Sequence, residues 1–409
     1  MIKIKKCRIS GSSNLINILS LGDQYLTGIF PKVKNEKITK GPLDLVLCPE
    51  SGLLQLGHSY DLNEMYGLNY GYRSGLNKFM VNHLNNKITY LTKIKPLKKN
   101  DIVLDIGSND GTLLNCYKVN NLLKIGIDPT GNKFINFYKK DIVLVSDFFN
   151  SSLFEKKFPG RKAKIITCIS MFYDLESPAS FVDQLSKVLD KDGICHFEQS
   201  YMPSMLRQNA YDTICHEHLE YYSLGVVKKL IEDANLKIID VQINGINGGS
   251  FAVTVTHKNA NFKTNDAIID WMLEQEDRMK LNTAEPYIEF KKRVFSHRTD
   301  LINLINNLNN KKKKIIGYGA STKGNVLLQF CNFTNNDLSC IAEVNPDKYG
   351  SYTPGTLIPI VSEADAKLMN PDYMLVLPWH FRDTIIKREE NYLKGGGKLI
   401  FPLPEIEIV

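Results

Sequence analysis

Long apolar runs are missing from this chain of 409 residues. No run approaches the roughly 18 apolar residues that a membrane-spanning helix needs, and the N-terminal stretch MIKIKKCRIS lacks the apolar core of a signal peptide. Cysteine is also sparse, because eight residues are scattered along the chain without the dense spacing of a disulfide framework. These absences predict a cytoplasmic protein with reduced cysteines and no membrane insertion.

Charge of one sign is not concentrated either. The formal net charge is +7, and the longest basic run, KKKK at residues 311–314, comes directly before an apolar strand-like stretch. This run is typical of a solvated helix end, although its field would also suit an anionic ligand. We therefore expect no nucleic-acid partner. Because 43% of the residues are hydrophobic and 23% are charged, the composition predicts a soluble globular protein, and we expect a monomer.

The pattern of the chain predicts four regions. Residues 1–85 alternate short strands and turns, and residues 86–260 alternate strand-like runs with helical stretches, which favours a doubly wound parallel α/β sheet. Residues 261–310 are polar with apolar steps of three and four residues, which predicts a helical connector. Residues 311–409 return to a second strand-and-helix alternation, which predicts another α/β domain.

The first glycine-rich turn lies in DIVLDIGSNDGTLLN, where Asp105, Gly107 and Gly111 follow a strand and open a helix. Glycine lets the backbone approach a ligand closely, and a helix N-terminus offers unpaired N–H groups to an anion. The spacing D-x-G-x-x-x-G differs from the dinucleotide pattern G-x-G-x-x-G. It resembles the first motif of class I S-adenosylmethionine (SAM) methyltransferases.

Two further acidic residues end the next strands. Asp128 is placed to accept hydrogen bonds from ribose hydroxyls, and the resemblance puts the adenine near Asp147. The alternative is that these aspartates only cap helices. The predicted cofactor site comprises Asp105, Gly107, Ser108, Asn109, Gly111, Asp128, Pro129, Asp147 and Phe148.

A second glycine turn, GYGASTKGN at residues 317–325, also lies between an apolar strand and a helix. Lys323 at the helix start would suit a pyrophosphate, and Glu343 near the end of the next strand could accept hydrogen bonds from hydroxyls. Tyr318 and Asn325 belong to the same predicted substrate site. The alternatives are a tight turn without a ligand, or the dinucleotide site of a dehydrogenase.

The stretch YDTICHEHLEYYS at residues 211–223 places two histidines beside a glutamate. Three hypotheses compete for it. A catalytic zinc would need a third ligand besides His216 and His218. Both imidazoles could instead be satisfied in a core. In the third hypothesis, a histidine removes a proton from a carbon next to a ketone, and a neighbouring tyrosine stabilises the enolate.

These motifs together resemble the SAM-dependent sugar C-methyltransferases that act on nucleotide-linked 4-keto deoxysugars. The resemblance extends along nearly the whole chain, from CRISG and LGDQ through YGYRSGLNKFMVNHL at residues 70–84, DIGSNDG, YDTICHEHLEYYS, NGGSFAVTV and GYGASTKGN to YTPGTLIPI and LVLPW. It implies an α/β fold with a small N-terminal zinc module, a central class I SAM methyltransferase domain, and a C-terminal Rossmann-like domain that helps to bind the nucleotide-sugar.

The resemblance also assigns roles to site residues. It places the general base at His218, with Glu217 beside it, and it puts Cys215 where the family has a tyrosine. The hydroxyl that Cys215 lacks suggests a different sugar or a donor from elsewhere. The other predicted catalytic residues are His216, Tyr70, Tyr72 and, as a weaker candidate, Tyr222; the remaining predicted substrate contacts are Glu198 and Gln199, at the end of a strand.

The zinc pattern of the family is incomplete here. Where the family has two C-x-x-C pairs, this chain has Cys7 with Ser10 and Cys48 with Ser51. A serine hydroxyl is a poor zinc ligand at neutral pH, because a ligand must carry a negative charge or a basic lone pair. We therefore predict no structural zinc.

The sequence predicts methyl transfer from SAM to the carbon next to the ketone of an activated 4-keto deoxysugar, at C-3, for a polysaccharide or another glycoconjugate. Two alternatives remain open. One is methyl transfer to a hydroxyl or amine of an activated sugar. The other is an NAD-dependent oxidation of a nucleotide-sugar by way of GYGASTKGN.

Overall fold

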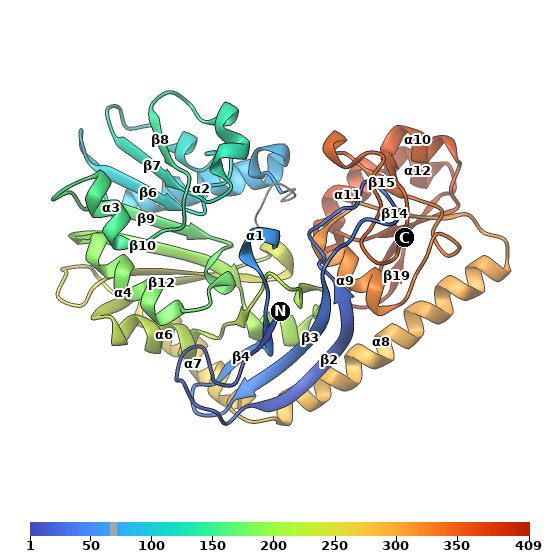
Figure 1. Ribbon diagram of the computed structural model, residues 1–409, viewed down its shortest axis with the longest axis horizontal. Coiled ribbons are helices and arrows are strands. Elements are labelled where there is room, and N and C mark those ends of the chain that lie inside the picture. The colour runs from blue at the N-terminus through green and yellow to red at the C-terminus, as the bar shows by residue number, and fades with distance from the viewer. Residues whose placement is uncertain (66–71) are drawn as a thin grey trace.

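The computed structural model describes residues 1–65 and 72–409, and it consists of three domains. In Figure 1 the central domain lies on the left and the C-terminal domain on the right, and long N-terminal strands run between and below them. In the part of the chain that the structure describes, no helix is both long and apolar enough to cross a membrane.

The central domain is built on a seven-stranded sheet of order β12-β13-β10-β9-β6-β7-β8. Every neighbouring pair from β10 to β8 is parallel, whereas β13 runs antiparallel to both β10 and β12. β6 pairs with both β7 and β9, so chain order reverses beside it, and ligands of open α/β sheets collect at such a point. The strands are β6 (Ile102–Ile106), β7 (Leu123–Ile127), β8 (Ile142–Val145), β9 (Ala163–Ile169), β10 (Leu189–Ser200), β12 (Leu236–Asn244) and β13 (Ser250–His257).

Helix α2 (Lys78–Ile94) begins where the Asn77 side chain accepts a hydrogen bond from the Phe79 amide. Its buried apolar residues recur at steps of three and four, and they pack in one core with strands of the central sheet. The boundary that the sequence suggests at residue 85 therefore falls inside a helix of the central domain. The other helices of this domain are α3 (Ser151–Lys157), α4 (Pro178–Val188), α5 (Met202–Arg207), α6 (Leu224–Asp233) and α7 (Asp266–Met279).

The N-terminal domain contains a four-stranded sheet of order β11-β4-β3-β2, in which all the pairs are antiparallel. Its edge strand β11 (Glu220–Tyr221) comes from the histidine-containing stretch in the middle of the chain. That stretch is therefore tied to the N-terminal domain by backbone hydrogen bonds. The other elements are β1 (Ile2–Lys3), β2 (Ile16–Tyr25), β3 (Lys40–Cys48), β4 (Leu53–Leu56), β5 (His58–Ser59) and α1 (Leu62–Met65).

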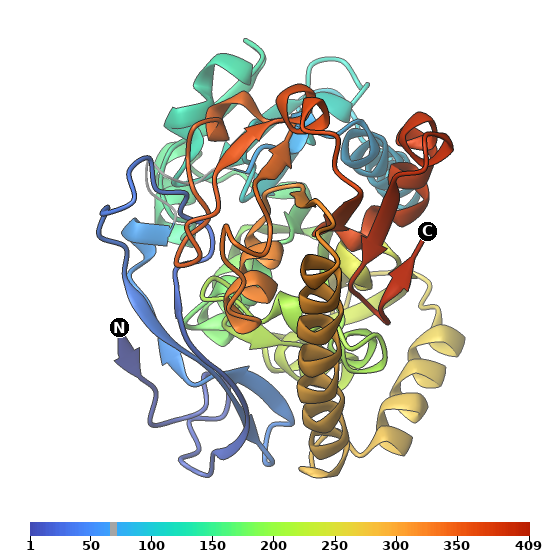
Figure 2. The same ribbon diagram turned by 90° about the vertical axis from the view of Figure 1, so that its right-hand side faces the viewer.

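The C-terminal domain has a six-stranded sheet of order β16-β15-β14-β17-β18-β19, parallel except for the last strand. The 26-residue helix α8 (Glu285–Asn310) leads to it, and one hydrophobic core joins α8, this sheet and the N-terminal sheet. Figure 2 shows α8 below the C-terminal domain. The elements are β14 (Ile315–Tyr318), α9 (Thr322–Phe330), β15 (Ile341–Glu343), β16 (Ile360–Ser362), α10 (Glu363–Leu368), β17 (Tyr373–Val376), α11 (Arg382–Arg388), α12 (Glu390–Lys394), β18 (Lys398–Phe401) and β19 (Glu407–Ile408).

Candidate active site

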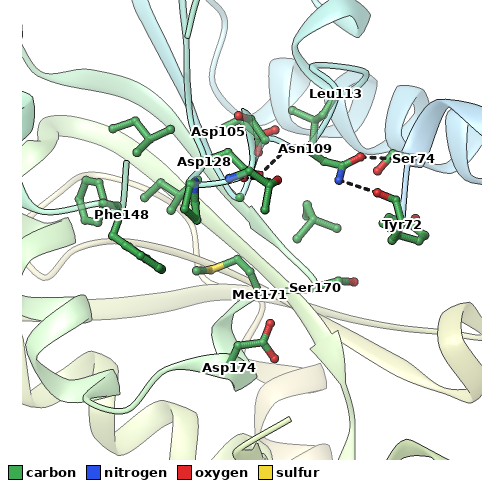
Figure 3. A pocket seen from close by; sticks show the side chains of 18 of the residues that line it. Tyr72, Ser74, Asp105, Asn109, Leu113, Asp128, Phe148, Ser170, Met171 and Asp174 are labelled. Atoms are coloured by element: carbon green, nitrogen blue, oxygen red, sulfur yellow. Dashed lines mark hydrogen bonds between the residues drawn. The ribbon is translucent and has the colours of Figure 1, made fainter. Parts of the chain in front are cut away.

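A cleft opens at the carboxyl ends of β6, β7 and β9, at the edge of the sheet where ligands of open α/β folds bind. Figure 3 shows Asp105 and Asp128 on one side of it, Asp174 on the other and Met171 between them. Seven of the nine residues predicted for the cofactor line this cleft: Asp105, Gly107, Ser108, Asn109, Asp128, Pro129 and Phe148.

The floor of the cleft is the glycine turn after β6. Gly107 has a φ of +75°, and a Cβ atom built on it would lie 3.1 Å from the Met171 side chain. Gly111 also has a positive φ, although it does not line the cleft. Asp105 is buried and accepts a hydrogen bond from Thr167 Oγ1 at 2.6 Å, and burial raises its pKa to about 7. The turn thus brings bare backbone to the cleft, as a bound cofactor requires.

Asp128 closes the same side of the cleft. Its carboxylate accepts hydrogen bonds from the Asn109 amide at 2.7 Å and from the Thr130 amide at 2.6 Å. Burial raises its pKa. A carboxylate has about four lone-pair positions, so Asp128 fits the ribose role while it also braces the glycine turn.

Asp147 is exposed and bonds to the Phe148 amide, and it does not line the cleft. The two phenylalanines after it, Phe148 and Phe149, do line the cleft and offer the aromatic surface that an adenine needs. Phe148 belongs to the cofactor site predicted from the sequence, whereas Phe149, and Ser170 and Met171 after β9, line the cleft without having been predicted. The adjacent aromatic pair at a strand end was the available signal.

Residues 72–74 are joined to the glycine turn by hydrogen bonds. The Asn109 side chain accepts a hydrogen bond from the Ser74 amide at 2.9 Å and donates one to the Tyr72 carbonyl at 3.1 Å (Figure 3). Tyr72 lines the cofactor cleft, and burial of its hydroxyl raises its pKa. Tyr70 lies outside the described residues.

We expect Gly107→Ala to weaken S-adenosylhomocysteine binding at least tenfold, because the new methyl group enters the cleft in a backbone conformation that L-residues rarely adopt. Gly160→Ala is the matched control. Gly160 has a similar φ of +67°, with nothing within 4 Å of a built Cβ. Calorimetric titration of both variants measures the effect. Equal affinities would mean that the cofactor does not lie against this turn.

His218 is held in a defined protonation pattern. Its Nδ1 lies 2.8 Å from the Thr213 carbonyl oxygen, which can only accept, so Nδ1 carries the proton and Nε2 keeps its lone pair. The ring packs on Tyr173, with centroids 4.2 Å apart. Burial and the nearby Lys323 lower the His218 pKa to about 3, so the imidazole is neutral at physiological pH.

His216 points elsewhere, because the chain turns between the two histidines and the His218 amide bonds back to the Cys215 carbonyl. The His216 ring is fully buried in the N-terminal domain, edge-on to Tyr60, and its Nε2 lies 3.4 Å from the Gly41 carbonyl oxygen. Burial lowers its pKa to about 4. The expectation that His216 takes part in catalysis is therefore wrong in position: it is a core histidine.

The other residues of the stretch divide between the two domains. Glu217 accepts a hydrogen bond from Thr27 Oγ1 at 3.3 Å, and burial raises its pKa. Cys215 is buried. Tyr222 is fully buried and stacked on Phe172 with centroids 5.0 Å apart, so it belongs to the core of the central domain rather than to a cleft.

Glu198 and Gln199 are both buried near the end of β10. Burial alone would raise the Glu198 pKa, but hydrogen bonds and charge from His83 and Lys87 lower it to about 2. Its carboxylate lies 2.5 Å from His83 Nε2 and 2.8 Å from Lys87 Nζ. Glu198 is thus already paired within the central domain. The Gln199 side-chain amide finds no partner among the described residues.

The C-terminal residues predicted for the sugar have varied positions. Glu343 accepts hydrogen bonds at 2.8 Å from the amides of Ala320, Val344 and Asn345, so it braces both its own turn and the glycine turn after β14. The Tyr318 hydroxyl bonds to Glu389, away from the glycine turn, and Asn325 donates to the Thr27 carbonyl in the N-terminal domain; these contacts are 2.9 and 2.7 Å long.

Lys323 crosses to the central domain, where its Nζ donates to the Asn247 carbonyl at 2.6 Å. Nearby, Trp379 Nε1 donates to Asp212 of the histidine-containing stretch at 2.7 Å. The start of α9 and the LVLPW segment therefore close over that stretch from the C-terminal side.

The residues at the expected zinc site do not fit the metal. Cys7 Sγ lies 3.3 Å from Ser51 Oγ, and Ser10 Oγ lies 3.5 Å from Cys48 Sγ. Burial opposes ionisation of Cys7, but hydrogen bonds from Ser51, Ser10 and the backbone lower its pKa to about 7. Across residues 1–65 and 72–409, no three His, Cys, Asp or Glu side chains are grouped as metal ligands would be.

Three family models match the chain. They describe a zinc-binding domain over residues 7–66, a methyltransferase domain over residues 76–241 and a C-methyltransferase C-terminal domain over residues 245–404. The chain is also 27% identical to C-methyltransferase NovU from Streptomyces niveus over 409 residues, which cover 99% of this chain and 97% of that protein.

Two solved structures are similar to part of the chain. One is magnesium protoporphyrin IX methyltransferase (ChlM) from Synechocystis PCC 6803 with bound SAM, at 12% identity over 43% of this chain and 79% of that chain, with a TM-score of 0.32. The other is N-methyltransferase NodS from Bradyrhizobium japonicum WM9 with S-adenosyl-L-homocysteine, at 12% identity over 44% and 88% of the two chains, with a TM-score of 0.33.

The methyltransferase model matches the residues that form most of the central sheet, and the predicted class I SAM methyltransferase fold is confirmed. The chain is a SAM-dependent methyltransferase with the domain organisation of C-methyltransferases.

Proposed function

We propose that this SAM-dependent methyltransferase adds a methyl group to C-3, next to the ketone, of a nucleotide-activated 4-keto deoxysugar. The observation that carries the proposal is the His218 imidazole, whose Nδ1–H is fixed on the Thr213 carbonyl while Nε2 keeps a lone pair. Transfer to a hydroxyl or an amine does not require a carbon-bound proton to be removed, whereas transfer to carbon does.

Bound SAM would supply an electrophilic methyl group, and the residues of the chain supply the rest. Gly107 and Asp128 hold the nucleoside at the β6 and β7 ends of the cleft, and Phe148 and Phe149 cover the adenine. His218 removes the proton from the carbon next to the ketone. Because Thr213 anchors the far side of the ring, the imidazole is oriented before the substrate arrives, and it accepts the proton on Nε2.

The substrate would lie between the central and C-terminal domains. The glycine turn after β14 contributes to binding the activated sugar, with α9 starting directly after it and its first residues meeting the histidine-containing stretch. Ser170 lines the cofactor cleft on the side toward this junction, where Asn247 contacts both Ser170 and Lys323. This arrangement favours a substrate whose nucleotide lies at the C-terminal glycine turn and whose sugar extends to the methyl group of SAM.

Incubation with methyl-labelled SAM and a panel of nucleotide-activated sugars tests the function. We expect the label to appear only with 4-keto sugars, and carbon NMR of the product should place it on the carbon next to the ketone. The matched 4-hydroxy sugars are the control, because they lack the acidified carbon–hydrogen bond. Equal methylation of a 4-hydroxy sugar, or a label on oxygen or nitrogen, would reject carbon transfer.

A further inference from the structure

Lys323 is part of the C-terminal domain, but its side chain contacts the central domain. It lies in the first turn of α9, and its Nζ reaches the Asn247 carbonyl at 2.6 Å. The Asn247 side chain lies 3.5 Å from Ser170 Oγ, and Ser170 lines the cofactor cleft. Asn247 therefore lies between the ammonium group and the rim of the cleft where the methyl group would be transferred.

The surroundings of Lys323 leave donor capacity for a ligand. An ammonium group has three N–H donors, and among residues 1–65 and 72–409 its one hydrogen-bond acceptor is the Asn247 carbonyl. Asp212 is close enough to favour the charged form electrostatically; its Oδ2 accepts from Trp379 Nε1 at 2.7 Å, and its Oδ1 has no hydrogen-bond partner among the described residues, so Asp212 is not a hydrogen-bond partner of Lys323. Burial in turn lowers the Lys323 pKa.

The charge of the same ammonium group acts on the predicted base, and the unusual cysteine acts on that charge. Lys323 is the charge that, after burial, most lowers the His218 pKa, and Cys215 is among the groups that act on Lys323. Cys215 stands where the family resemblance expects a tyrosine, and a thiol is a weak hydrogen-bond donor. A cation beside it would supply the missing donor in a stronger form.

We propose that Lys323 Nζ donates a hydrogen bond to the ketone oxygen of the substrate and stabilises the enolate formed when His218 removes the neighbouring proton. This inference rests on the proposed function. The proton moves from carbon to His218 Nε2, the electron pair of that bond forms the carbon–carbon double bond, and the carbonyl π pair moves onto oxygen. In the methyl transfer, the pair of the carbon–carbon double bond forms the new bond to the methyl carbon, and the pair on oxygen reforms the ketone. The sulfur of SAM keeps the electrons of the broken sulfur–methyl bond.

The charges favour this arrangement over a pyrophosphate contact. Proton transfer creates an imidazolium near an existing ammonium group, which is unfavourable unless an anion forms beside both. The enolate oxygen is that anion. A pyrophosphate partner, as the sequence motif suggests, would place the Lys323 charge at the far end of the substrate, whereas the observed contact with Asn247 directs it to the cleft rim.

Lys323→Met tests the inference, with Lys348→Met as the matched control. Lys348, like Lys323, is half-buried in the C-terminal domain, and its Nζ also donates to one carbonyl, that of Ala320, at 2.7 Å. The readout is exchange of the proton next to the ketone with deuterated water, at saturating keto sugar and S-adenosylhomocysteine. We expect Lys323→Met to slow exchange by about 100- to 1000-fold and Lys348→Met to leave it within threefold.

Binding separates this role from phosphate binding and from misfolding. Lys323→Met should bind S-adenosylhomocysteine, uridine diphosphate and thymidine diphosphate within threefold of the wild type. The inference would be overturned if Lys323→Met exchanged the proton as fast as the wild type. It would also be overturned if this variant exchanged the proton normally but bound nucleoside diphosphates tenfold more weakly. If the wild type itself exchanges no proton of any keto sugar in the panel, the proposed function fails instead.

Discussion

His218→Ala is expected to abolish exchange of the proton next to the ketone while leaving both ligands bound. The imidazole acts mainly in the transition state, so its loss should appear in the rate rather than in the affinities. General base catalysis contributes about 100- to 10,000-fold, and methylation should fall by that factor. Deuterium wash-in with S-adenosylhomocysteine measures the proton step directly, because no methyl group is transferred.

Two neighbouring variants make the result specific. Glu217→Gln keeps the shape of a side chain that bonds to Thr27 and should reduce the rate less than His218→Ala does. Thr213 anchors His218 through its backbone, so a side-chain change such as Thr213→Val should leave the tautomer in place. Near-normal methylation by His218→Ala would assign the base to another residue and remove the main support for carbon methylation.

Local sequence patterns predicted the part of the site that one strand and its following turn can build. Gly107 and Asp128 lie at the ends of adjacent parallel strands, and the register of those strands follows from apolar runs that the sequence displays. For this reason the cofactor side of the cleft could be predicted from the sequence. Phe149 was not predicted to line the cleft, because an aromatic residue beside a strand end is equally typical of a hydrophobic core.

The substrate side depends on packing between domains, which no local pattern encodes. β11 joins the sheet of the N-terminal domain although about 160 residues of chain separate it from its partner β4. The turn before it sends His216 into one domain and leaves His218 at the junction, whereas an extended strand would have put both on one side. The sequence likewise placed Lys323 at the start of a helix after a glycine turn, but it did not indicate the contact with Asn247, because Asn247 lies in another domain.

Two N-terminal turns retain the shape of a metal site without its ligands. The Gly11 amide donates to the Cys7 carbonyl at 3.0 Å, and the Gly52 amide donates to the Cys48 carbonyl at 2.9 Å. Both glycines have a positive φ, of 70° at Gly11 and 71° at Gly52. Each turn therefore brings a cysteine close to the residue three positions later. That residue is a serine in both turns, Ser10 after Cys7 and Ser51 after Cys48.

Replacing Ser10 and Ser51 by cysteine is expected to create a zinc site. The cross-contacts of 3.3 Å between Cys7 and Ser51 and 3.5 Å between Ser10 and Cys48 put four side chains around one centre, and the substitutions change only the ligand atoms. Four thiolates bind zinc tetrahedrally, with apparent free energies of about 10 to 16 kcal/mol in small zinc domains. We expect the double variant to retain one zinc per chain through dialysis and the wild type to retain none.

Metal analysis after dialysis and thermal unfolding with and without a chelator measure the gain together. Because bound metal stabilises the folded state by mass action, the Ser10→Cys, Ser51→Cys variant should melt higher with zinc and lose that increase with chelator. Cys7→Ser in the same background removes one of the four thiolates and should weaken binding strongly, which is the control for non-specific capture by surface cysteines. One zinc per wild-type chain would mean that two thiolates and two hydroxyls suffice here, and a double variant without zinc would mean that the four side chains do not converge on one centre.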